Sequence, residues 1–149
     1  LMDMTTSYLY VSVLFFTAYV DNIFSAVSEV TVFARVGETA VLPCALSSVH
    51  GRAVHIKWRR KSQTVFERIG KGSYEDEGYQ GRVVVPEENL RKGNCSLVLK
   101  KVRKSDAAVY NSYHFIYMRK KSANVLINTV KLQVIDETGR SSYRKWPFL

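Results

Sequence analysis

The chain has 149 residues, a length that suits one globular domain and is too short for two of ordinary size. Hydrophobic residues make up 46% of it, with 8 Gly and 3 Pro, which excludes a collagen-like or low-complexity disordered protein. Lys and Arg outnumber Asp and Glu by 22 to 13, so the formal charge of +9 permits attraction to anionic surfaces without identifying one.

The N-terminal segment has the composition of a secretory leader. The first 28 residues contain no Lys or Arg, and an apolar run extends from Tyr8 to Val20. A helix of that length measures about 20 Å, short of the ~30 Å hydrocarbon core of a bilayer. Ala26 and Ser28 are small residues that suit the positions before a cleavage site. We predict a signal peptide over residues 1–28; a buried N-terminal strand or helix is the alternative.

From residue 29 the sequence alternates short runs of Val, Ile, Leu, Thr and Tyr with turn residues. A period of two predicts half-buried strands, and no helical stretch of convincing length interrupts it. We interpret residues 71–81 as a polar loop and residues 119–121 as a basic loop. The result is an all-β domain of about eight or nine antiparallel strands over residues 29–136, with a polar tail over residues 137–149. The predicted strands cover residues 30–35, 40–46, 53–59, 64–69, 82–85, 95–100, 108–118 and 126–135.

The sequence shows no catalytic constellation. His50, His55 and His114 have neither zinc-ligand spacing nor a paired cysteine or carboxylate pattern. No Gly-rich phosphate loop occurs, and no nucleic-acid-binding motif accompanies the positive charge. We therefore expect a protein that is not an enzyme, with no metal, cofactor, small-molecule substrate or nucleic-acid partner. His114 falls on the inward register of its strand and is expected to be a core residue.

A spaced series of residues resembles the signature of immunoglobulin variable-type (V-set) domains, which reads Cys, then Trp, then Asp-x-Ala-x-Tyr-x-Cys. Here Cys44 and Trp58 are followed by the run DAAVYNS at residues 106–112, so Ser112 stands where the second cysteine is expected. The resemblance covers residues 30–135 and points to butyrophilins and T-lymphocyte activation antigens. It implies an immunoglobulin-like antiparallel β-sandwich of the variable type.

The resemblance also implies structural roles for four residues. In such domains the residue matching Trp58 packs in the core, and the hydroxyl of the residue matching Tyr110 bonds the backbone a few residues upstream. The residues matching Arg82 and Asp106 form an ion pair that closes the bottom of the sandwich. All four identify the fold and not the partner.

Cys95 replaces the missing cysteine in our interpretation. In the implied fold Cys44 and Cys95 face the core from neighbouring strands, where opposed Cα atoms are ~4.5–5.5 Å apart. Oxidising conditions after export favour a bond between them. We predict a Cys44–Cys95 disulfide within one sheet, with two buried free thiols as the alternative. Ser112 is then a small buried hydroxyl beside Trp58 that needs a hydrogen-bond partner.

Alternation in the strands around Trp58 and Tyr110 directs aromatic, basic and polar side chains outward, joined by Lys131 and Gln133 of the last strand. Exposed aromatic rings beside basic residues are typical of protein–protein hot spots. The resemblance implies that another immunoglobulin-like cell-surface protein docks on this sheet; the alternative is that the rings merely cover it. The set consists of His55, Lys57, Arg59, Asn111, Tyr113, Phe115 and Tyr117.

The function that the resemblance implies is a non-catalytic binding module that regulates T-cell or other leukocyte responses. It is expected to be secreted or to lie on the extracellular side of the plasma membrane. A receptor domain that itself receives a ligand is the closest alternative. A secreted module that binds heparan sulfate through basic clusters at residues 59–61, 100–104 and 119–121 is another.

The tripeptide Asn94-Cys95-Ser96 is an N-glycosylation sequon. Asn94 is expected to face outward, which favours its modification. A disulfide at the middle residue would hinder it, so both outcomes stay open.

Overall fold

The protein is described by a computed structural model that covers residues 3–11, 29–47, 54–118, 121–136 and 138–139. Residues 4–11 are helical and exposed. Most of the predicted signal segment, the tip of the basic loop and most of the predicted tail lie outside the described residues. These three assignments therefore stay predictions.

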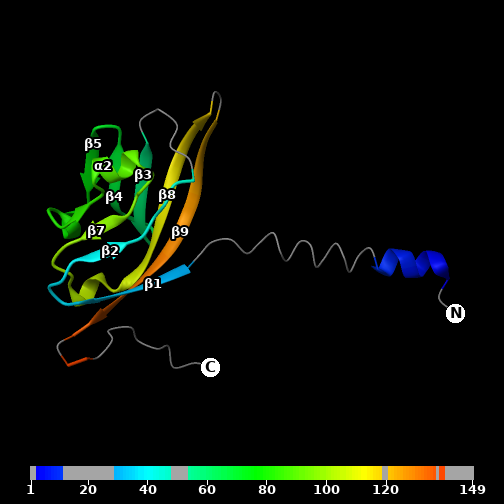
Figure 1. The fold of residues 1–149 in the computed structure, drawn as a ribbon, viewed down its shortest axis with the longest axis horizontal. Coiled ribbons are helices and arrows are strands. Elements are labelled where there is room, and N and C mark those ends of the chain that lie inside the picture. Colours follow the sequence, from blue (N-terminus) through cyan, green and yellow to red (C-terminus); the bar gives the residue numbers. More distant parts are fainter. Residues whose placement is uncertain (1–2, 12–28, 48–53, 119–120, 137, 140–149) are drawn as a thin grey trace.

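Two sheets pack face to face into a sandwich (Figure 1). The first sheet has six strands in the order β1-β9-β8-β3-β4-β5, and the second has three in the order β2-β7-β6. Strand β1 runs parallel to β9, and the other pairs are antiparallel. The all-β architecture predicted from the alternation and the sandwich implied by the resemblance are thus confirmed. The described strands are β1 (Glu29–Arg35), β2 (Ala40–Leu42), β3 (His55–Arg60), β4 (Gln63–Ile69), β5 (Gly72–Glu75), β6 (Val83–Val84), β7 (Leu97–Leu99), β8 (Ala108–Met118) and β9 (Lys121–Ile135).

The core fills the space between the two sheets with inward side chains from both. Trp58 of β3 and Tyr110 of β8 are the largest fully buried side chains among the described residues. Leu42 and Leu97, a directly opposed pair in the second sheet, are buried with them. Burying each such side chain contributes roughly 1.5–3 kcal/mol, which makes this core the main source of stability.

Residues 71–81 were expected to form a loop, but they contain strand β5 and the short 3-10 helix η1 (Glu77–Tyr79). Strand β5 lies at the edge of the first sheet, and Gly72, Ser73 and Tyr74 are exposed. Backbone pairing with β4 holds the strand, and burial contributes little. Because the strand does not need to bury apolar side chains, its sequence shows no apolar alternation.

The second predicted strand ends earlier than residue 46, because β2 stops at Leu42, directly before Pro43. Proline has no N–H to donate to a strand ladder. The pairing resumes beyond it, where the Cys95 amide donates to the Cys44 carbonyl oxygen at 3.0 Å. The two cysteines are therefore directly opposed even though both lie outside the regular strands.

A short helix, α2 (Glu87–Arg91), follows Pro86 and was not expected from the sequence. Its five residues make little more than one turn, so no 3.6-residue periodicity can show. It buries Leu90 in the core and carries an exposed ion pair of 2.7 Å between Glu87 and Arg91.

Candidate functional site

The predicted partner-binding residues lie on what we call the outer face, meaning the side of the six-stranded sheet that points away from the second sheet. Ile56 and Trp58 of β3 are buried in the core, so the residues that alternate with them point outward. The pairing of β3 with β8 arranges six of the seven predicted residues in directly opposed pairs, with Tyr117 two residues further along β8. These pairs are His55–Phe115, Lys57–Tyr113 and Arg59–Asn111.

His55 is the centre of a compact cluster on the outer face. Its ring stacks on Phe115, with centroids 4.1 Å apart and planes at 14°. Its Nδ1 lies 2.9 Å from the hydroxyl of Tyr117, and its Nε2 lies 2.6 Å from Oε1 of Glu67. His55 is only 5% exposed, because these neighbours cover it. We expected His55 to be exposed on this face, but the structure buries it beneath the neighbouring side chains.

Glu67 of β4 completes the cluster and was not singled out in the sequence. Its Oε1 lies 3.0 Å from Nζ of Lys57, which also sits 4.8 Å from the centroid of the Phe115 ring. Burial opposes ionisation of Glu67, but hydrogen bonds with His55 and Lys57 outweigh it and hold its pKa below the usual value. The carboxylate is therefore charged at neutral pH. Glu67 lies opposite Lys57 because of the β3–β4 register, and that register cannot be read from the sequence.

Accessibility varies across the outer face. Tyr117 is 66% exposed, whereas Tyr113 and Phe115 are half-buried. Two residues outside the predicted set extend the exposed apolar surface: Ile69, opposite His55, is 55% exposed, and Tyr74, on the edge strand, is 52% exposed. Exposed apolar side chains on one face of a sheet are candidates for an interaction surface. Tyr74 was not predicted for this face because residues 71–81 were expected to form a loop.

Two predicted residues of the outer face lie apart from the His55 cluster. Arg59 donates from Nη2 to the carbonyl oxygen of Ser62 at 2.8 Å. Asn111 accepts at Oδ1 from Oγ1 of Thr129 at 2.8 Å. Both side chains therefore form hydrogen bonds with residues outside the His55 cluster.

His114, which was expected in the core, is half-buried opposite Ile56. Burial lowers its pKa, and the nearby His55 acts in the same direction. The ring is therefore neutral at pH 7. It fills the inner side of β8 and does not take part in the outer face.

The lower end of the sandwich is closed by a buried ion pair. Arg82 donates from Nη1 and Nη2 to the carboxylate of Asp106 at 2.8 and 3.1 Å. The hydrogen bond to Asp106 raises the pKa of Arg82. The Tyr110 hydroxyl donates to the Asp106 backbone carbonyl at 2.6 Å. These contacts are structural, as the resemblance implied.

Cys44 and Cys95 are joined by a disulfide with Cα atoms 4.9 Å apart, within the second sheet. Fully buried Ser112 donates from Oγ to Oδ1 of Asn128, whose Nδ2 donates to the Pro43 carbonyl oxygen at 2.6 Å. This polar path joins the two sheets beside the place of the usual inter-sheet disulfide. Asn128 was not singled out in the sequence, because its role depends on lying opposite Ser112 in β9.

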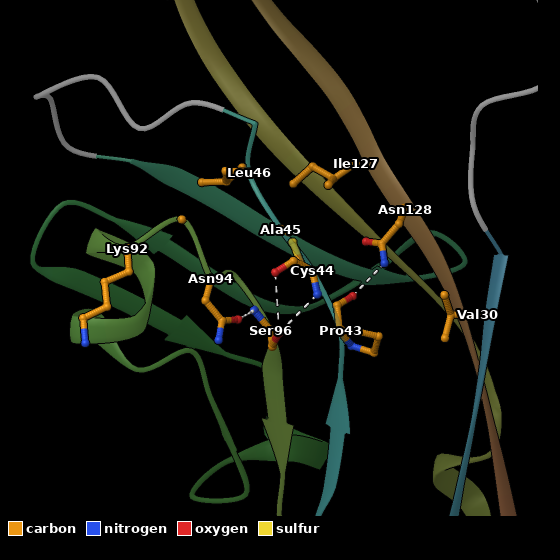
Figure 2. A pocket seen from close by; sticks show the side chains of 11 residues that line it. Val30, Pro43, Cys44, Ala45, Leu46, Lys92, Asn94, Ser96, Ile127 and Asn128 are labelled. Atoms are coloured by element: carbon orange, nitrogen blue, oxygen red, sulfur yellow. Dashed lines mark hydrogen bonds between the residues drawn. The ribbon is translucent and has the colours of Figure 1, made fainter.

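A hollow of about 600 Å³ opens beside this path (Figure 2). Asn94 stands at one side of it, and Val30 stands at the other. Its lining combines apolar side chains with the backbone around the disulfide. The lining includes Val30, Pro43, Leu46, Asn94, Ile127 and Asn128.

No group of three His, Cys, Asp or Glu side chains in the described part of the chain is arranged to hold a metal ion. Over the same residues, no helix combines the length and the apolar character needed to cross a bilayer.

The two-sheet topology, buried Trp58 and the Arg82–Asp106–Tyr110 contacts define an immunoglobulin-like domain of the variable type. The sequence profile of the immunoglobulin V-set domain matches residues 27–135. The chain belongs to the immunoglobulin V-set family.

Curated relatives include butyrophilin subfamily 1 member A1 of Bos taurus and of Homo sapiens. Each is 30% identical over 88 residues, which cover 55% of this chain and 17% of the relative. The match thus spans a small part of the length of these relatives.

Solved structures share the fold. The human B7-H4 IgV-like domain superposes with a TM-score of 0.57 at 24% identity, covering 70% of this chain and 92% of that one. A chain from the crystal structure of ICOS in complex with ICOS-L and an anti-ICOS-L VNAR domain gives a TM-score of 0.63 at 24% identity, covering 72% of this chain and 55% of that one.

Proposed function

We propose that this chain is a non-catalytic binding module of an immune cell-surface or secreted protein, and that it regulates T-cell or other leukocyte responses. Its outer face docks on another immunoglobulin-like cell-surface protein on the extracellular side of the membrane. The match to butyrophilin and the fold shared with B7-H4 support the class of protein.

The observation that carries the proposal is the ordered cluster around His55. Stacking on Phe115 and the contacts to Tyr117 and Glu67 hold the rings in place before any partner arrives. A preorganised aromatic surface loses little side-chain entropy on binding. Tyrosine in such a setting is a typical hot-spot residue.

A partly exposed ion pair beside apolar surface also favours a protein partner over a lipid or a small molecule. Lys57 and Glu67 are each about one-fifth exposed, with side-chain values of 22% and 20%. They can add polar contacts at the rim of an interface whose centre is formed by Tyr117 and Ile69.

The test is binding of a bivalent fusion of the domain to resting and activated leukocytes. Tyr117→Ala removes the most exposed ring of the cluster, and we expect binding to weaken by at least about tenfold. The thermal midpoint should fall by only a few degrees, because the side chain is 66% exposed. Phe115→Ala is a poorer probe, since it also uncovers His55.

Val41→Ala is the matched control, because Val41 is 52% exposed on the second sheet. It should bind leukocytes like the parent. Unchanged binding by Tyr117→Ala, or equal loss in the control, would contradict docking through the outer face. Immobilised domain that alters T-cell activation supports a ligand role; binding without any such effect favours the receptor alternative.

Heparan sulfate is a second candidate partner, because the structure brings two of the three basic clusters to one end of the sandwich. Arg60 donates from Nη1 to the carbonyl oxygen of Ser105 at 2.8 Å, which joins the turn at Lys61 to the residue that follows the cluster at residues 100–104. Lys61 and Lys101 are both exposed there. Sulfated chains bind such cationic surfaces in a salt-dependent manner.

A charge-matched pair of variants tests this candidate on a heparin column. Lys61→Ser with Lys101→Ser should elute at lower salt than Lys71→Ser with Lys92→Ser, two exposed lysines elsewhere. Equal elution of the two variants would contradict a site at this end. Leukocyte binding that disappears after heparinase treatment would favour heparan sulfate over a protein partner.

A further inference from the structure

The tripeptide Asn94-Cys95-Ser96 combines a glycosylation sequon with one half of the disulfide. It is the single Asn-x-Ser/Thr sequon in the sequence, so any N-linked glycan on this chain must be attached at Asn94. Its three side chains differ sharply in access: Asn94 is exposed, Ser96 is half-buried and Cys95 is fully buried.

Hydrogen bonds hold the folded tripeptide in one closed conformation (Figure 2). Oδ1 of Asn94 accepts from the Ser96 amide at 3.0 Å. Oγ of Ser96 accepts from the Cys44 amide at 3.1 Å and lies 3.5 Å from the Cys44 carbonyl oxygen. Because Cys44 is also bonded to Cys95, the segment cannot extend without breaking these contacts.

We propose that Asn94 is an N-glycosylation site that is modified before the Cys44–Cys95 disulfide closes, so that oxidation and glycosylation of the domain compete. Nδ2 of Asn94 loses a proton and bonds to the anomeric carbon of an oligosaccharide carried on a polyisoprenyl pyrophosphate. The bond from that carbon to the pyrophosphate oxygen breaks, the lipid pyrophosphate leaves with the bonding electron pair, and the proton from Nδ2 passes to the solvent. The acceptor must present its amide together with the hydroxyl two residues on, which the open chain allows and the closed tripeptide does not.

The folded domain can accommodate the glycan once it is attached. Asn94 is exposed, and no hydrogen bond within the described residues engages its Nδ2. The hollow of about 600 Å³ opens beside it, with Leu46 and Ile127 in its wall. A glycan at this rim covers the apolar wall of the hollow. Asn94 adjoins the second sheet, so the glycan leaves the outer face of the first sheet free.

The experiment scores newly made chains in the endoplasmic reticulum of mammalian cells. The full chain is delivered there behind an added leader of known efficiency, so the outcome does not depend on export through residues 1–28. Occupancy is measured by the mass shift on peptide N-glycosidase treatment after a short labelling pulse. Cys44→Ser removes the disulfide and leaves the tripeptide intact, and Ser96→Ala destroys the sequon.

We expect the parent to be a mixture of modified and unmodified chains and Ser96→Ala to carry no glycan. The unmodified fraction in Cys44→Ser should be lower than in the parent by about twofold or more. Cys44→Ser does not have to fold, because occupancy is set before folding. Unmodified Asn94 in both the parent and Cys44→Ser would overturn the site, and equal partial occupancy would overturn the competition. Neither result bears on leukocyte binding, which is measured separately.

Discussion

The indole Nε1 of Trp58 donates a hydrogen bond of 3.0 Å to the backbone carbonyl oxygen of Cys95. Trp58 lies in β3 of the first sheet, and Cys95 lies two residues before β7 of the second, so this bond joins the two sheets. The disulfide of Cys95 does not, because its partner Cys44 belongs to the same sheet. Packing and hydrogen bonds therefore close the sandwich, and the sulfur bridge constrains one half of it.

Replacing both cysteines, Cys44→Ala with Cys95→Ala, should lower the free energy of unfolding by about 2–5 kcal/mol. The bridge spans 51 residues of sequence, and losing it frees that loop in the unfolded chain. The bond from Trp58 survives, since it ends on a backbone oxygen, so the β-sheet circular dichroism should persist. Urea unfolding followed by circular dichroism measures the change; a loss below about 1 kcal/mol would contradict this role.

Ser112 and Asn128 should behave as a coupled pair in a double-mutant cycle. Each single change to Ala leaves a buried polar group without its partner, at a cost of about 1–3 kcal/mol. The double variant should lose less than the sum, with a coupling of about 0.5–3 kcal/mol. Asn111 and Thr129 are the control, because they bond across the same two strands but are only half-buried. Equal coupling in both cycles would contradict a special stabilising role for the buried Ser112–Asn128 pair.

Removing one partner of the buried ion pair should be far more destructive than removing one of an exposed pair. Arg82→Met leaves the Asp106 carboxylate buried without its cation, and we expect a loss of about 3–5 kcal/mol. Arg91→Met breaks the exposed pair with Glu87 on α2 and should change stability by no more than about 0.5 kcal/mol. Chemical denaturation of the two variants measures both losses of stability. Similar losses would contradict the prediction that the buried pair matters more than the exposed one.

Glu67 should make part of the stability dependent on pH in the acid range. Its pKa is lower in the folded chain than the value of about 4.3 expected when unfolded, because His55 and Lys57 favour the carboxylate over the opposing effect of burial. The contribution is therefore present above the unfolded pKa and is lost as the pH falls through the folded one. The difference in unfolding free energy between the parent and Glu67→Gln should shrink between about pH 5 and pH 3.

Urea unfolding at a series of pH values measures that difference. Glu87→Gln, on the exposed face of α2, is the control and should show a smaller dependence. A difference that stays constant or grows toward pH 3 would mean that Glu67 is not held as a charged acceptor.

The sequence predicted which side chains point toward the outer face, but not how exposed each of them is. Alternation correctly separated outward residues such as His55 and Lys57 from inward Trp58, because side-chain direction in a strand is a local property. It could not predict that Phe115 and Tyr117 would cover His55. Nor could it find Tyr74, whose edge strand is held by backbone pairing and has no apolar alternation.

By itself the sequence determined the class of fold and the core around Trp58 and Tyr110, and it predicted the Cys44–Cys95 disulfide that the structure contains. These predictions depend on the two-residue period of strands and on the spacing of the residues that match the family signature, and both can be read from the linear sequence. Only the tertiary structure decided that Glu67 joins His55 and that Asn128 links Ser112 to the second sheet. Both depend on register between strands, and the register shifts after Trp58 in β3–β4 and after Ser112 in β8–β9. A shift of one residue exchanges the two faces of a strand, so partners across a sheet emerge only once the strands are paired.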